Sequence, residues 1–153
     1  ILYRRGGSYE RLGKFNKSDN DLMNSLKVIP DDAYVLNYLA YSWLERGIKI
    51  KLAIEMLERA HQQKRNDPYI LDSVGWAYYL IKDFKKAKFF LQKAIILMPQ
   101  DPVVNDHYAD ILWQLGKKIQ AAYYWNIVLT LDDTNEEMKQ DIKTKILYGP
   151  KKI

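Results

Sequence analysis

An all-α fold of repeated helical hairpins is the fold class that this sequence predicts, on three observations. The pattern of the stretch from Pro68 to Asp101 returns directly afterwards, from Pro102 onward. Apolar residues inside each copy recur at helical spacing. Both copies open on Asp-Pro, an N-cap followed by a proline at the first helical position. A repeat of 34 residues is typical of an α-solenoid, in which stacked helix pairs share a core. The aligned pairs are Gly75 with Ala109, Tyr78 with Leu112, Ala87 with Ala121, and Leu91 with Trp125.

The first hairpin is predicted over residues 1–32. Its residues with the spacing of the third repeat are Gly6, Tyr9, Gly13, Phe15, Ser18, Leu22, Ser25 and Pro30. Two adjacent glycines inside the first helix each lower helix stability by roughly 1 kcal/mol relative to alanine. We therefore expect the N-terminal helix to fray unless something covers it.

The second hairpin is predicted over residues 33–67. Asp32 is suited to cap its first helix, and Leu36, Leu39 and Trp43 form an apolar stripe. Its second helix lies one residue later than the strict period requires. The turn between Gly47 and Lys51 is the place where we expect the extra residue.

The third and fourth hairpins are predicted over residues 68–101 and 102–133, the last with a boundary as late as 135. Each of their helices has one small residue at an equivalent place, which lets the paired helices approach closely. We expect Trp125 and its equivalent, Leu91, to fill the space beside these small residues.

Residues 134–153 break the repeat, and we expect a capping helix followed by a mobile tail. Thr134 and Glu137 have the spacing of a capping box. Met138, Ile142 and Ile146 make a narrow apolar stripe, which is suited to cover the exposed end of a solenoid.

Composition sets limits on the class of protein. At 48% hydrophobic and 28% charged residues, the chain has the balance of a folded protein rather than a disordered one. It has no cysteine, so disulfides and thiolate zinc sites are excluded, and no apolar run of about 18 residues. The chain begins at Ile1 without a signal peptide, which fits a fragment of a longer protein. The compartment stays open between the cytoplasm and a bacterial cell envelope or periplasm.

The repeated residues resemble those of a known family. The pattern Gly-x-x-Tyr-x-x-x-Gly-x-Phe in Gly6–Phe15, with the later alanine and proline positions, resembles the tetratricopeptide repeat (TPR) over residues 1–133. The stretches LDSVGWAYYL and NDHYADILWQLG resemble bacterial TPR adaptor proteins, some of which are lipoproteins of the cell envelope. The resemblance implies a right-handed α-solenoid of about four hairpins, with the first helices lining a concave groove that holds a partner protein.

The groove positions that this resemblance implies are aromatic and acidic, without lysine or arginine. This composition favours a peptide or helix that carries apolar and basic residues, and it disfavours a clamp for a C-terminal carboxylate. The alternative is that the aromatic rings pack between repeats and expose little surface. The first hairpin offers Tyr3, Gly7 and Glu10; the other predicted residues are Tyr34, Asn37, Tyr41, Leu44, Tyr69, Asp72, Trp76, Tyr79, Val103, Asp106, Asp110 and Trp113.

Other functions have less support. An uncovered terminal repeat offers apolar surface for a homodimer. The lysines of the second helices offer weak nucleic-acid binding, but no recognition helix or base-stacking module accompanies them. The chain has only two histidines, and His107 with Asp106 and Asp110 on one helix is too small a set for a metal site. The sequence therefore predicts no catalytic residue, metal or cofactor.

Overall fold

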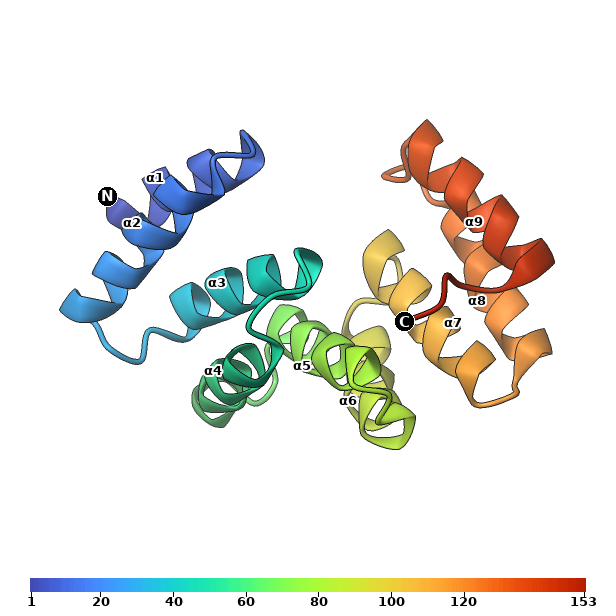
Figure 1. Ribbon diagram of the computed structural model, residues 1–153. Helices are drawn as coiled ribbons and strands as arrows, with labels where there is room; N and C mark the ends of the chain where they lie inside the picture. Colours follow the sequence, from blue (N-terminus) through green and yellow to red (C-terminus); the bar gives the residue numbers. More distant parts are fainter. The chain divides into compact units, whose positions relative to one another are not determined.

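The computed structural model describes residues 1–153 and consists of α-helices without strands (Figure 1). The all-α fold class predicted from the sequence is confirmed. The helices are α1 Leu2–Arg11, α2 Phe15–Val28, α3 Ala33–Glu45, α4 Ile50–Gln63, α5 Pro68–Leu80, α6 Phe84–Leu97, α7 Pro102–Gln114, α8 Lys118–Thr130 and α9 Glu136–Tyr148. None of these helices is long and apolar enough to cross a bilayer.

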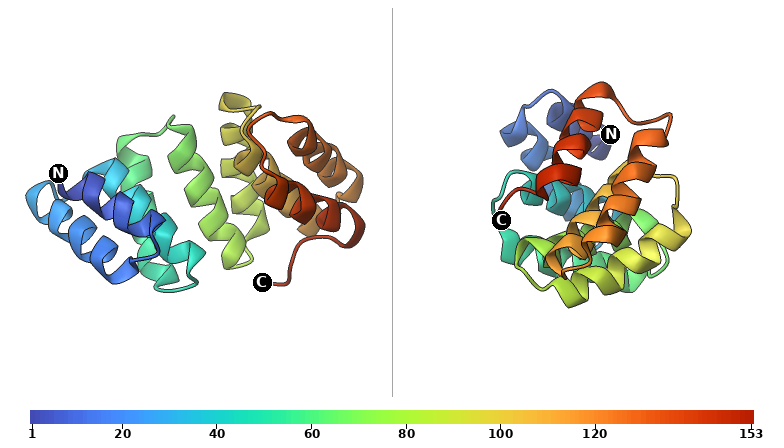
Figure 2. Two further views of the ribbon diagram at one scale, coloured as in Figure 1. Left: turned by 90° about the horizontal axis from the view of Figure 1, so that it is seen from above. Right: turned by 90° about the vertical axis from the view of Figure 1, so that its right-hand side faces the viewer.

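The chain divides into two compact units, with α5 contributing to both. Unit 1 comprises Ile1–Ser73, where α1 packs against α2, α2 against α3, and α3 against α4. Unit 2 comprises Val74–Ile153, where α6 packs against α7 and α7 against α8. The last helix, α9, lies beside α8 (Figures 1 and 2).

Most of the helix starts are capped by an acidic or amide side chain. The Asp32 carboxylate accepts hydrogen bonds from the backbone N–H groups of Tyr34 and Val35, and the Asp101 carboxylate accepts one from Val104. The predicted capping box at Thr134 is wrong. Asn135 caps α9 instead, while the Thr134 hydroxyl donates to the Val128 carbonyl at 2.7 Å and so satisfies an acceptor near the end of α8.

One residue with a left-handed backbone stands at the same place in each of the four hairpin turns. Glycine occupies this place at Gly13, Gly47 and Gly116, and Lys82 occupies it in the third hairpin with a φ of 65°. The second turn spans residues 46–49, whereas the others span 12–14, 81–83 and 115–117. The extra residue of the second hairpin therefore lies where the spacing predicts it.

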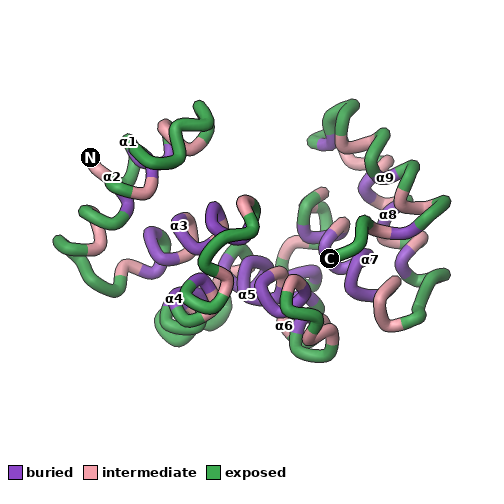
Figure 3. The backbone as a smooth tube through the Cα atoms, in the orientation of Figure 1, coloured by how far each residue is buried: buried purple, intermediate pink, exposed green.

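The core is formed by the small and the large apolar residues that recur in each repeat. Most of the buried residues lie on α3, α5 and α7 (Figure 3). A Cβ built on Gly75 would lie 1.8 Å from Cδ2 of Leu91, so glycine is required for this close approach. Ala109, Ala121 and Trp125 are fully buried in the next hairpin, as the repeat predicts.

The N-terminal helix is packed in spite of its two glycines. A Cβ on Gly6 would lie 2.9 Å from Cγ of Leu22, and Arg5 donates to Asp21 through Nε at 2.6 Å and Nη2 at 2.9 Å. Glycine therefore lowers the helix propensity of α1 but permits its close contact with α2.

Candidate functional site

Outside the first hairpin, the residues predicted to bind a partner lie on α3, α5 and α7, the first helices of their hairpins. Six of them belong to unit 1 and six to unit 2. A single groove that joins the two units stays a prediction. Their exposure differs widely. Tyr34, Tyr69 and Val103 are exposed; Asn37, Tyr41, Trp76, Asp106 and Trp113 are half-buried; Leu44, Asp72, Tyr79 and Asp110 are buried.

Tyr34 and Tyr69 are the predicted aromatic residues with the most free surface. Both stand in the first turn of a helix, and the two residues are 49% and 61% exposed. Their backbone N–H groups donate to the capping carboxylates of Asp32 and Asp67. Each cap thus fixes the backbone from which an exposed ring projects.

Tyr38 was not among the predicted residues, but it connects α3 to α1. Its hydroxyl lies 3.3 Å from both the Gly7 carbonyl and Oε2 of Glu10, and its ring meets Tyr3 edge-on at 5.9 Å. Burial and the nearby Glu10 carboxylate raise the pKa of Tyr38. The face predicted for the first hairpin is therefore engaged with α3 of the same chain.

In unit 2, aromatic rings link the end of α5 to α7. Trp76 stacks on Tyr79 with centroids 4.6 Å apart and on His107 with centroids 3.9 Å apart. The Tyr79 hydroxyl accepts a hydrogen bond from Nε2 of Gln114 at 3.2 Å. Burial raises the pKa of Tyr79 to about 12, so this hydroxyl stays protonated at neutral pH. Here the rings serve mainly to hold neighbouring helices together.

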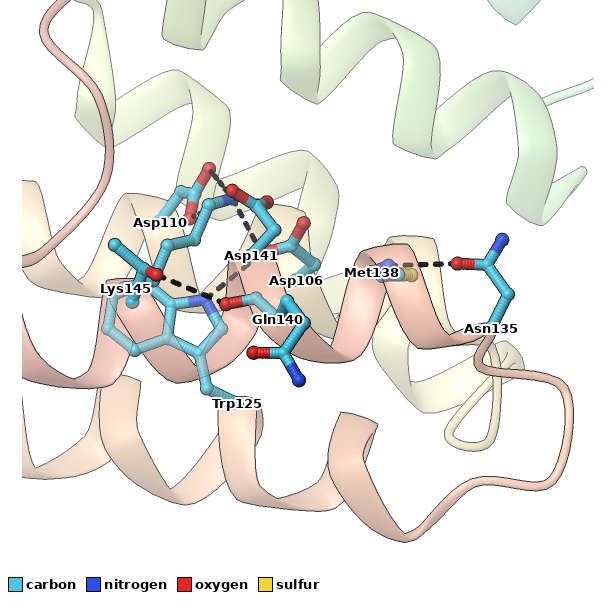
Figure 4. Close-up of polar contacts among 9 residues, drawn as sticks. Asp106, Asp110, Trp125, Asn135, Met138, Gln140, Asp141 and Lys145 are labelled. Atoms are coloured by element: carbon cyan, nitrogen blue, oxygen red, sulfur yellow. Dashed lines mark hydrogen bonds and ion pairs between the residues drawn. The ribbon is translucent and has the colours of Figure 1, made fainter.

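Asp106 and Asp110 form a buried ionic cluster with a lysine from α9 (Figure 4). Nζ of Lys145 donates to Oδ1 of Asp106 at 2.9 Å and to Oδ2 of Asp110 at 3.1 Å. Nε1 of Trp125 donates to the same oxygen of Asp106 at 3.0 Å. The Lys145 side chain is only 12% exposed. We refer to Asp106, Asp110, Trp125 and Lys145 as the Lys145 cluster.

The Lys145 cluster has two carboxylates for one ammonium group, and the half-exposed carboxylate of Asp141 lies 3.8 Å from the same Nζ. Burial, together with the negative charge of Asp106, raises the pKa of Asp110 to about 7, against the opposing effects of Lys145 and His107. Burial alone would lower the pKa of Lys145, but Asp110 and Asp106 raise it above its ordinary value. The ammonium group is therefore retained, and one carboxylate is left in excess.

Trp113, the last predicted residue of α7, also contacts its own chain. A Cβ on Gly149 would lie 2.4 Å from the Trp113 ring, so only a glycine can lie against this face of the indole. Nζ of Lys118 lies 4.7 Å from the centroid of the same ring. Residues that follow α9 thus cover part of the surface predicted for a partner.

Sequence reasoning missed Lys145, although a signal for it was present. Lys145 follows Ile142 by three residues, so the two side chains share one face of α9. Ile142 is fully buried. A lysine on the apolar face of a capping helix indicates an ion pair with a carboxylate of a neighbouring helix, although not with which one. No group of three or more His, Asp or Glu side chains is arranged to hold a metal ion.

Successive helix pairs with one small residue in each helix define an α-helical repeat protein. A family model described as tetratricopeptide repeat matches residues 2–134, and the chain belongs to this family. The TPR repeat-containing protein PA4667 of Pseudomonas aeruginosa is 31% identical over 103 residues, which is 67% of this chain and 18% of that protein. Anaphase-promoting complex subunit 3 of Schizosaccharomyces pombe is 25% identical over 109 residues, 71% of this chain and 15% of that protein. The chain thus spans less than a fifth of either relative.

Solved structures agree with the family in fold. TTC0263, a thermophilic TPR protein of Thermus thermophilus, superposes with a TM-score of 0.79 at 17% identity, covering 95% of this chain and 80% of that one. MamA of Desulfovibrio magneticus RS-1 superposes with a TM-score of 0.72 at 21% identity, covering 88% and 76%. At these identities the likeness establishes the TPR fold.

Proposed function

We propose that this chain is a protein-binding scaffold whose first-helix face holds a peptide or helix that carries apolar and basic residues. The membership of the TPR family supports the general part, because such repeats present rigid helices on which contacting side chains are preorganised. The Lys145 cluster is the observation that carries the specific part.

In the Lys145 cluster, α9 supplies the kind of side chains that the proposed partner would supply. Its Ile142 is buried, and three residues later Lys145 places its ammonium group between Asp106 and Asp110. The acidic face of α7 can therefore hold a lysine from a helix that also buries an apolar residue. We infer that a partner of the same pattern suits the equivalent faces of the other first helices.

A partner would contact those predicted residues that remain exposed on the first helices. Tyr34 and Tyr69 expose large rings on a fixed backbone, and Val103 is also exposed. Tyrosine is enriched among residues that dominate binding energies because it buries a large area at low entropic cost. By contrast, Asp106 and Asp110 already have a lysine partner in this chain.

The test is affinity capture with the full chain from a lysate of its source, compared with the Tyr34→Ala and Tyr69→Ala variants. Each variant should weaken partner binding by at least tenfold, since loss of a binding hot spot costs ~2 kcal/mol or more. The control is Asn126→Ala, which changes an exposed residue of a second helix.

Equal retention by the wild type and both tyrosine variants would show that the partner binds elsewhere. A partner that is retained and whose binding segment contains no basic residue would contradict the specific part of the proposal. In that case the general function as a scaffold would stand.

A further inference from the structure

The second helices of unit 2 differ in charge from the rest of the chain. Residues 84–100 and 111–131 contain no aspartate, glutamate or arginine. They contain six lysines, namely Lys85, Lys86, Lys88, Lys93, Lys117 and Lys118. These two stretches, which include the second helices α6 and α8, therefore have positive charge, and neither contains a carboxylate that would neutralise it. We refer to the exposed side of α6 and α8 as this surface.

Two aromatic rings project from this surface at equivalent places in successive repeats. Phe89 and Tyr123 occupy the same position of the third and fourth repeats and are 55% and 63% exposed. Each ring is supported edge-on by the ring of the next residue, at 5.3 Å from Phe90 and 5.2 Å from Tyr124. Both rings are thus supported by a neighbouring ring, and both residues stay more than half exposed.

Exposed aliphatic side chains accompany the two rings. Ile96 is 73% exposed on α6, and Ile119 is 89% exposed in the first turn of α8. On α6 the spacing places Lys85, Phe89, Lys93 and Ile96 along one side of the helix. Nζ of Lys93 lies 4.2 Å from the centroid of the Phe89 ring. Apolar and cationic groups are therefore interleaved on this side of α6.

Lys88 of α6 and Lys117, directly before α8, lie next to each other. Their side chains contact one another, and this contact, together with burial, lowers the pKa of Lys88. Two neighbouring ammonium groups without a carboxylate between them favour an anion. We name the set of Lys85, Phe89, Lys93, Ile96, Lys117, Ile119 and Tyr123 the basic aromatic face.

The equivalent surface of unit 1 has neither exposed aromatic rings at these places nor lysines without acidic neighbours. Asn20 of α2 and Glu55 of α4 occupy the places of Phe89 and Tyr123 in the repeat. Those helices also contain acidic residues, namely Asp19, Asp21, Glu55 and Glu58. The repeat architecture itself therefore does not require exposed rings and unbalanced lysines at these positions.

We propose that the basic aromatic face binds the surface of a membrane that contains anionic lipids. Lysines attract the anionic headgroups, and each one near such a surface contributes about 1 kcal/mol. Exposed phenylalanine, tyrosine and isoleucine insert into the boundary between headgroups and acyl chains. The lysine stems lie along the apolar region while their ammonium groups reach the phosphates.

A lipid surface fits this face better than a nucleic acid does. Arginine, the residue that most often reads bases and grips phosphate in a fixed geometry, is absent from both stretches. Ile96 and Ile119 offer no hydrogen bond to a base or phosphate, and aliphatic side chains do not form the stacking platforms that single strands need. Insertion into a bilayer uses these aliphatic side chains directly.

The experiment measures binding of the full chain to two kinds of vesicle, phosphatidylcholine alone and a two-to-one mixture of phosphatidylcholine with phosphatidylserine. Co-sedimentation at low and high salt gives the apparent affinity. We expect binding to the phosphatidylserine vesicles only, weaker at high salt. Lys85→Glu/Lys93→Glu should reduce it by at least tenfold, from ~1 kcal/mol per lysine and tenfold per ~1.4 kcal/mol. Phe89→Ser/Tyr123→Ser should also reduce it.

The matched control is Lys27→Glu/Lys51→Glu, which makes the same charge change at exposed lysines of unit 1. Lys51 occupies the place of Lys85 in the second repeat. Equal loss in the control, or equal binding to both kinds of vesicle, would overturn the proposal. So would tighter binding of duplex DNA or RNA than of phosphatidylserine vesicles at the same salt concentration. Far-ultraviolet circular dichroism checks that each variant keeps its helix content.

Discussion

Lys145 illustrates how one side chain can change the chemistry of a predicted face. Asp106 and Asp110 lie on one side of α7, and without a partner they would repel each other in a buried position. Lys145 supplies the positive charge from α9, and Trp125 adds a hydrogen bond to Asp106. The cluster therefore stabilises the contact between α7 and α9 as well as defining what this face can bind.

Replacing Lys145 with Met should lower the free energy of unfolding by about 3 kcal/mol, because removal of one partner leaves the other charges buried and uncompensated. Urea unfolding followed by circular dichroism measures this loss. Lys143→Met removes an exposed lysine of the same helix and should have little effect. Equal stability of the two variants would show that the cluster contributes no net stabilisation.

Asp110 should make stability fall as pH rises from about 4 to about 7. An aspartate in the unfolded chain ionises near pH 4, whereas burial raises the pKa of Asp110 to about 7 in the folded chain. Between these values the folded state binds more protons, so stability decreases with increasing pH.

The Asp110→Asn variant should lack this contribution. Its free energy of unfolding minus that of the wild type should therefore increase across the same pH range and level off above it. Urea midpoints across this range measure the difference, with Asp133→Asn as the control because Asp133 is exposed and lies outside the Lys145 cluster. A constant difference across the range would contradict the raised pKa. The lowered pKa of Asp21, caused by its hydrogen bonds with Arg5, acts equally in both proteins.

At the scale of the element, the hairpin turns determine how each helix pair closes. A left-handed residue occurs at the same place in all four turns, and only the third turn has a side chain other than glycine there; the second turn has a further left-handed residue, Lys49, directly before α4. The left-handed conformation costs a non-glycine residue roughly 1–2 kcal/mol, whereas glycine adds unfolded-state entropy worth about 0.4–1 kcal/mol. The conformational cost is the larger of the two effects.

Lys82→Gly should therefore stabilise the chain by about 0.5–1 kcal/mol. The reciprocal change, Gly116→Lys, should destabilise it by a similar amount, because nothing lies within 4 Å of a Cβ at Gly116 and only backbone strain is added. Thermal unfolding of the two variants measures both shifts. Shifts of the same sign would show that side-chain contacts, rather than backbone conformation, dominate these turns.

At the scale of the whole molecule, the division into two units predicts that a destabilising substitution in one unit affects the other unit less. In a repeat protein, each element interacts mainly with its neighbours, so stability is approximately a sum of local contributions. Trp125 is fully buried in unit 2, and truncation of such a side chain costs ~3–5 kcal/mol.

Trp125→Ala should accordingly increase amide hydrogen exchange in α7, α8 and α9 more than in α3 and α4. Hydrogen exchange with mass spectrometry of peptides from the two units measures this difference. The counterpart Trp43→Ala removes a buried tryptophan of unit 1 and should give the opposite pattern. Equal loss of protection in both units, for either variant, would mean that the chain unfolds as one cooperative body.

Much of the fold could be predicted because its signals are local. The spacing of Gly75, Ala87 and Leu91, and its return in the next repeat, depends only on neighbours along the chain. The extra residue in the second turn followed from the same counting. Thr134 was misassigned because its hydroxyl can either accept from a backbone N–H group of the following helix or donate to a carbonyl, and the carbonyl of Val128 is met only when α8 has formed.

The candidate site was less predictable because exposure depends on residues far away in sequence. Tyr34 and Tyr69 stand in the first turns of their helices, where neighbouring repeats cover little, and they remain exposed. Tyr79 and Asp110 have the same periodicity but lie against other helices and are buried. Periodicity gives the side of a helix on which a residue lies, and it does not give the depth to which that side is covered.

The sequence by itself determined the number of hairpins, their turns and the small residues at which paired helices meet, because each of these follows from repetition and local backbone preference. Only the tertiary structure decided that Asp106 and Asp110 share one ammonium group from within the chain. Lys145 is 39 and 35 residues away from them, and the angle at which α9 packs determines whether its ammonium group reaches the carboxylates.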